Sequence, residues 1–81
     1  MHIKEWAQKH DEKPLLRALH DLGKAASKQW VMEVVFADRA RCLGYVSALF
    51  WRDLITGAEH ERFCQEIVAL AQQGKRHAVS A

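Results

Sequence analysis

The sequence has few of the residues that interrupt helices or cross-link small folds. It contains one proline, four glycines and two cysteines in 81 residues. Sparse breakers favour long helices over a β fold with many turns. Two cysteines without a Cys-x-x-Cys pair are too few for a disulfide framework, so we expect Cys42 and Cys64 to be reduced thiols in a cytoplasmic protein. The fold class that we expect is all-α.

Long hydrophobic runs and a concentrated charge are also missing. The longest uncharged apolar stretch, residues 42–51, is about half as long as a membrane helix. The N-terminus lacks the apolar segment of a secretion signal. The formal net charge is +2, and its surplus lies in residues 1–28, whereas nucleic-acid-binding domains usually present a concentrated basic face. We therefore expect no membrane partner, and a nucleic-acid partner is a weaker expectation than a protein one.

The length allows one domain, residues 1–81. A chain this short buries only about 60–65% of its unfolded surface, so a single core is marginally stable. Small folds compensate by oligomerisation or by very regular helix packing, among other means. We expect residues 1–13 to form one or two helical turns or a loose arm, and residues 75–81 to be a frayed tail.

Hydrophobic spacing predicts three main helices. Asp11 is the expected N-cap of the first, which carries Leu15, Leu19, Leu22 and Ala26 on one face and ends near residues 23–28, where Ser27 could cap the next helix. The second spans about residues 29–55. Its β-branched beginning, residues 30–36, could instead be a strand that pairs with its own copy, but no second strand candidate exists within the chain.

A capping box marks the start of the third helix. Thr56 and Glu59 match the S/T-x-x-E pattern, in which each side chain binds the other residue's backbone N–H. The predicted helix runs over residues 57–73, and Gly74 is a natural residue to follow its end. The expected architecture is a small three-helix bundle, or a helical hairpin with a long central helix, and we expect a homodimer.

The central helix is apolar on most sides and must be covered on most sides. One stripe holds Met32, Phe36, Leu43, Val46, Phe50 and Leu54, and a second holds Val31, Val35, Cys42, Tyr45 and Leu49. Small residues at Ala40, Gly44 and Ala48 would let another helix approach closely. Two interpretations remain open: a buried central helix in a bundle, or a helix that dimerises or docks a partner.

The sequence favours a small protein-binding regulator that sequesters or inhibits a larger protein. Aromatic side chains and arginines are enriched at the centres of protein interfaces. The predicted partner-binding residues are Trp30, Phe36, Arg39, Arg41, Tyr45, Phe50, Trp51 and Arg52.

Three other functions have weaker support. A helix-turn-helix DNA-binding regulator could be read in residues 41–73, but Glu59 and Glu61 make the start of its last helix acidic, which repels DNA. His60 and Cys64 are spaced i, i+4 and could join Cys42 as zinc ligands, but a fourth ligand is missing. Phosphate-binding and catalytic motifs are absent, so we expect no enzyme activity, no metal and no cofactor.

The segment from Ala40 to Leu49, Ala-Arg-Cys-Leu-Gly-Tyr-Val-Ser-Ala-Leu, is followed by Asp-Leu-Ile-Thr-Gly-Ala-Glu over residues 53–59. This arrangement resembles small helical proteins of phages and conjugative elements, in which a helix with a Leu-Gly-Tyr core leads to a Leu-Ile-Thr-x-x-Glu turn and a short closing helix. The resemblance covers about residues 38–73. It implies an adaptor that dimerises and sequesters a regulator, or one that blocks a defence complex, and it assigns no functional residue.

Overall fold

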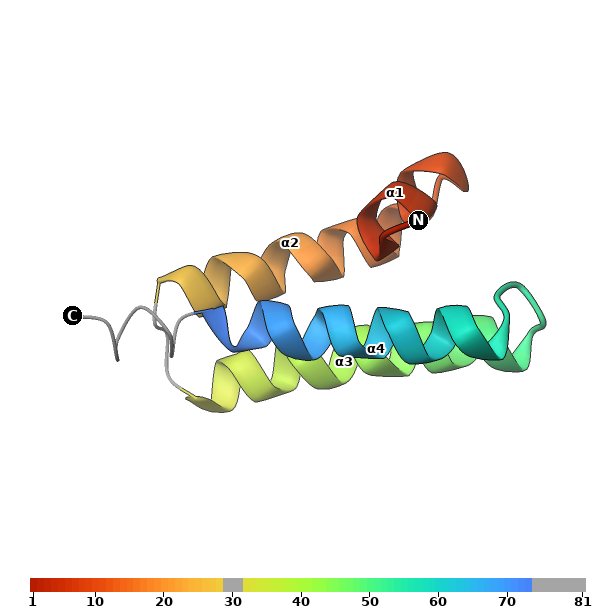
Figure 1. The fold of residues 1–81 in the computed structure, drawn as a ribbon. Coiled ribbons are helices and arrows are strands. Elements are labelled where there is room, and N and C mark those ends of the chain that lie inside the picture. Colours follow the sequence, from red (N-terminus) through yellow and green to blue (C-terminus); the bar gives the residue numbers. More distant parts are fainter. Residues whose placement is uncertain (29–31, 74–81) are drawn as a thin grey trace.

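The computed structural model describes residues 1–28 and 32–73 of the chain. Within these residues the protein is all-helical, with α1 (Ile3–Lys9), α2 (Lys13–Ser27), α3 (Met32–Trp51) and α4 (Gly57–Ala71). The three longer helices lie side by side, and successive ones run in opposite directions (Figure 1). The expected all-α class is confirmed, and a helical bundle fits the arrangement.

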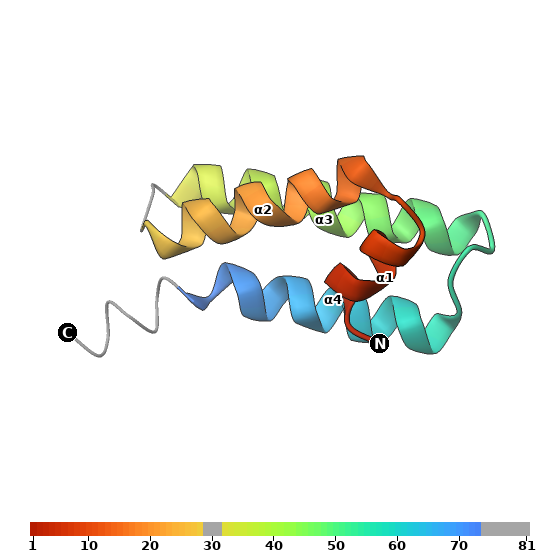
Figure 2. The same ribbon diagram turned by 90° about the horizontal axis from the view of Figure 1, so that it is seen from above.

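The core lies between α2, α3 and α4, and α1 closes it at one end. Figure 2 shows α1 in the space between α2 and α4, near the N-terminal end of α2. The largest fully buried side chains come from the three longer helices. They are Leu15, Leu22, Cys42, Val46, Leu49, Phe63 and Ile67.

Residues 3–9 are helical. Of the two conformations expected for the N-terminus, helical turns or a loose arm, the structure has the first. Trp6 is only 5% exposed, stacks on His10 with ring centroids 4.3 Å apart and packs against Phe63 of α4. Glu66 of α4 accepts a hydrogen bond from the backbone N–H of Ile3 at 3.1 Å. The first helix is therefore part of the folded unit.

Asp11 lies just after the C-cap of α1, His10, and the prediction that it is the N-cap of α2 is wrong. Its φ is 54°, in the left-handed region, and the N-cap of α2 is Glu12, which makes no side-chain cap bond. The backbone N–H of Glu12 donates to Ala7 O at 2.8 Å and that of Asp11 donates to Gln8 O at 3.3 Å. These two bonds are the Schellman pattern of a helix C-terminus. Asp tolerates the left-handed conformation better than most residues, because its short polar side chain bonds locally.

The same motif ends α3 at Trp51, four residues before the predicted end. Asp53 has a φ of 60°, the N–H of Leu54 donates to Leu49 O and the N–H of Asp53 donates to Phe50 O, both at 3.0 Å. Aspartate is less common than glycine at this position, so the stop signal in the sequence is weak.

The predicted capping box at Thr56 is confirmed. The N–H of Glu59 donates to the Thr56 hydroxyl at 3.1 Å, and the N–H of Thr56 donates to a Glu59 carboxylate oxygen at 2.9 Å. Ser27, by contrast, does not cap the next helix, because it is the last residue of α2 and its hydroxyl donates to Lys24 O. The preferred helical interpretation of residues 30–36 holds from Met32 to Phe36, which lie in α3, and the strand alternative does not apply there. Gly74 and the basic residues after it lie outside the described residues.

Candidate functional site

The α3 helix has a buried side and an exposed side. Its buried residues, Val35, Cys42, Val46 and Leu49, recur at intervals of three, four or seven and face the core. Its exposed residues follow the same spacing on the opposite side. We define the α3 outer face as the exposed residues Glu33, Phe36, Ala37, Ala40, Gly44, Ala48, Trp51 and Arg52.

Two large aromatic side chains, Phe36 and Trp51, lie near the two ends of the α3 outer face. Trp51 is 83% exposed and Phe36 is 46% exposed. They are fifteen residues apart in one helix, which corresponds to about 22 Å along its axis. A single exposed apolar residue is ordinary, but two aromatic rings on one face of one helix make that face a candidate binding site.

The middle of the α3 outer face is shallow. Gly44 lies there with exposed Ala40 and Ala48 one turn away on either side. A Cβ atom added at Gly44 would meet no atom within 4 Å, so the helix backbone is directly accessible. A second helix can approach this part of α3 more closely than a surface of larger side chains would permit.

The predicted partner-binding residues divide into outward and inward groups. Phe36, Trp51 and Arg52 belong to the α3 outer face, and Trp30 lies outside the described residues. Arg39 stacks on the Phe36 ring with its guanidinium carbon 4.6 Å from the ring centroid. Arg41 is exposed and pairs with Asp21 of α2 at 3.2 Å.

Tyr45 and Phe50 make contacts within the chain. The Tyr45 hydroxyl donates to a carboxylate oxygen of Glu12 at 2.8 Å, which ties α3 to the start of α2. Burial, together with this carboxylate, raises the pKa of Tyr45. The Phe50 ring lies 4.9 Å from that of His60 on α4. Both side chains fix the packing of α3, which holds the outer face in place.

Sequence analysis overlooked Glu33 as a member of this surface. Glu33 is exposed on the α3 outer face, and Met32 is 42% exposed beside it. A helical projection places Glu33 in line with Ala40 and Gly44. The sequence could not show which side of this nearly all-apolar helix is covered by the neighbouring helices.

Both thiols lie in environments that raise their pKa. Cys42 is fully buried, and this burial raises its pKa to about 11. Burial also raises the pKa of Cys64. A catalytic or redox-sensing cysteine requires the thiolate form near neutral pH. These environments favour the neutral thiol instead.

His60 and Cys64 approach each other, with Nε2 and Sγ 3.8 Å apart, while Cys42 belongs to the core. Among residues 1–28 and 32–73, no three histidine, cysteine or acidic side chains cluster as metal ligands would. In the same part of the chain, no helix is long and apolar enough to cross a membrane.

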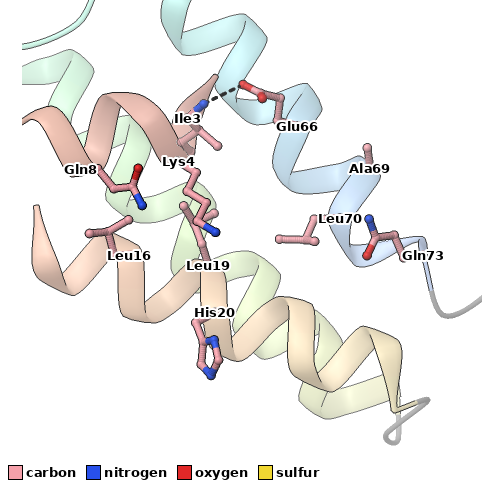
Figure 3. Close-up of a pocket in the computed structure, with 10 residues that line it drawn as sticks. All are labelled: Ile3, Lys4, Gln8, Leu16, Leu19, His20, Glu66, Ala69, Leu70 and Gln73. Atoms are coloured by element: carbon pink, nitrogen blue, oxygen red, sulfur yellow. Dashed lines mark hydrogen bonds between the residues drawn. The ribbon is translucent and has the colours of Figure 1, made fainter. Parts of the chain in front are cut away.

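A groove of about 620 Å³ lies between α1, α2 and α4 (Figure 3). Ile3, Leu16, Leu19 and Leu70 supply apolar lining. Glu66, the acidic residue of the lining, already accepts the Ile3 N–H. Polar lining also comes from Lys4, Gln8, His20 and Gln73.

The relative orientation of α3 and α4 differs from that of a helix-turn-helix. DNA-binding helix pairs of that type cross at about 90–120°. Figures 1 and 2 both show α3 and α4 side by side as a hairpin. The helix after the turn also keeps its acidic first turn, with Glu59 engaged in the capping box.

No protein-family model matches this chain, and no curated protein or solved structure matches it. The resemblance to phage and mobile-element proteins over residues 38–73 therefore stays a prediction, and the chain is characterised by its own geometry: a helical bundle with an exposed aromatic face on α3.

Proposed function

We propose that this chain is a small protein-binding regulator, which uses the α3 outer face to dock against a helix of a larger protein and mask that surface. The exposure of Trp51 supports the proposal most directly. A tryptophan ring that is 83% exposed keeps a large apolar area in contact with water. Covering it on binding supplies favourable free energy, and tryptophan is the residue type most enriched at binding hot spots.

The shape of the face favours a helical partner. Gly44 and its neighbouring alanines form a shallow strip between Phe36 and Trp51. A helix laid along this strip would contact both rings, because helical partners present anchors on one side at intervals of three or four residues. Arg52 at one end and Glu33 at the other would set the orientation of the partner by charge.

Affinity capture from a lysate of the native host tests this proposal. Four tagged proteins are compared, with and without nuclease: the wild type, Phe36→Ala, Trp51→Ala and the control Gln65→Ala on the exposed side of α4. We expect one stoichiometric, nuclease-resistant protein with the wild type and the control, and its loss with the two α3 variants. Equal capture by all four would place the binding face elsewhere. Partners that disappear with nuclease would instead favour a nucleic-acid-binding protein.

A further inference from the structure

We propose that the α3 outer face pairs with the same face of a second copy of this chain, with the two α3 helices antiparallel and crossing at Gly44. The inference rests on the proposed function to the extent that both use this face. The inference goes further because it names a second copy of the chain as the molecule that covers the α3 outer face. A larger partner would then have to displace that copy.

The aromatic and small residues of the α3 outer face are placed almost symmetrically about Gly44. Phe36 and Trp51 lie near the ends of this face, and the midpoint between them falls between residues 43 and 44. Ala40 and Ala48 have their midpoint at Gly44. A twofold axis beside Gly44 would therefore place each aromatic ring of one copy next to the other kind of ring in its partner. Such self-complementary faces are what twofold-symmetric dimers require.

The charges of the face select the antiparallel orientation. Glu33 lies near the N-terminal end of α3, and Arg52 follows its C-terminal end. In an antiparallel pair, Glu33 of each copy lies near Arg52 of the other, so opposite charges meet twice. In a parallel pair, Glu33 would lie near Glu33 of the other copy and Arg52 near Arg52. Repulsion between these like charges disfavours that arrangement.

The exposed aromatic rings would supply about half of the area that a stable dimer buries. Phe and Trp side chains bury about 150–250 Å² when they are fully covered. Scaled by their exposed fractions, Phe36 and Trp51 of two copies would together bury roughly 600 Å². That is about half of the smallest interface typical of stable complexes, which start near 1,200 Å². The rest of the contact would have to come from close approach of the two helices at Gly44, where a Cβ atom would meet open space.

Sedimentation equilibrium over a wide concentration range tests the pairing. We expect the wild type to be a reversible dimer, and Gly44→Glu to be a monomer, since it would place two carboxylates together at the axis. The matched variant Gln65→Glu adds the same charge on α4 and should leave the dimer intact. Helical circular dichroism should be unchanged in Gly44→Glu, because a side chain there meets open space. A wild type that stays monomeric throughout, or a Gly44→Glu protein that still dimerises, overturns the proposal.

A mixing experiment tests the antiparallel orientation. Glu33→Arg alone would place Arg near Arg52 of the partner, and Arg52→Glu alone would place Glu near Glu33, so each homodimer should be at least tenfold weaker than the wild type. An equimolar mixture restores an opposite-charge pair at both ends and should dimerise as the wild type does. Failure of the mixture to recover, with both variants folded, excludes the antiparallel arrangement.

The two proposals can fail separately. If the wild type is monomeric but Trp51→Ala still loses a captured partner, the second-copy inference is wrong and the regulator proposal stands. If the dimer forms with the expected charge dependence and no nuclease-resistant partner is captured, the self-pairing stands and the regulator proposal fails.

Discussion

The indole ring of Trp6 packs against the phenyl ring of Phe63, with their centroids 6.0 Å apart. This contact joins the seven-residue α1 to α4. A helix of that length is unstable by itself in water, so tertiary packing must hold it. Trp6 is almost completely buried and Trp51 is almost completely exposed, so the same type of side chain occurs in two opposite environments in this protein.

Replacing these two tryptophans by alanine should have opposite consequences. Trp6→Ala should lower the free energy of unfolding by about 3–5 kcal/mol, because it leaves a cavity in the core. Trp51→Ala should change it by less than about 0.5 kcal/mol at a concentration where the protein is monomeric, as substitutions of exposed side chains usually do. Urea denaturation followed by circular dichroism measures both. Loss of helical structure in Trp51→Ala would remove the basis for placing this residue in a binding face.

Glycine at Asp53 should stabilise the protein. Asp53 holds a φ of 60° at the end of α3, a conformation that costs an L-residue energy and glycine almost none. We expect Asp53→Gly to raise the free energy of unfolding by about 0.5–1 kcal/mol and Asp53→Ala to lower it. Thermal unfolding of the two variants compares them directly. A lower melting temperature for the glycine variant would show that the side chain contributes more than the backbone strain costs.

The capping box should contribute stability at neutral pH that is lost in acid. The hydrogen bond from the Thr56 backbone N–H is the main cause that lowers the pKa of Glu59. A carboxylate with a lowered folded pKa stabilises the fold above its unfolded pKa and ceases to do so as the pH falls through the folded pKa. Thr56→Ala should cost about 1 kcal/mol at pH 7. In urea titrations, Glu59→Ala should differ from the wild type most at neutral pH and least at pH 3.

Cys42 should make stability fall at high pH. Burial raises its pKa from an ordinary 9.0 to about 11, so the unfolded thiol ionises first. The unfolded state is therefore favoured as the pH rises from 9 to 11, by about 1.4 kcal/mol per unit and at most about 3 kcal/mol in total. Cys42→Ala lacks this contribution, although it should be slightly less stable at pH 7. Urea midpoints at pH 7, 9 and 10.5 should converge for the two proteins, and parallel curves would argue against a buried neutral thiol.

Some local features could be predicted from the sequence because they depend on near neighbours alone. Thr56 and Glu59 identify a helix start by their spacing, and the structure contains that capping box. The ends of α1 and α3 were missed because Asp11 and Asp53 occupy positions where glycine is the usual signal. An aspartate before a helical pattern is more often an N-cap, which explains the error at Asp11.

The candidate site was predictable in part. The apolar character of α3 and the spacing of Gly44 with its neighbouring alanines are visible in the sequence, and they indicated a surface for another helix. The sequence could not separate Phe36 from Tyr45, because both lie on apolar stripes of the same helix. Only the positions of α2 and α4 determine that Tyr45 reaches Glu12 while Phe36 stays half exposed.

The sequence by itself determined the all-helical class, because it has few breakers and strong helical periodicity, and it determined the start of α4 through a local capping motif. The tertiary structure alone decided that Trp6 belongs to the core and Trp51 to the surface. Burial depends on which helices pack against each other, and this packing joins residues as distant in the chain as Trp6 and Phe63. No local pattern of residues contains that information.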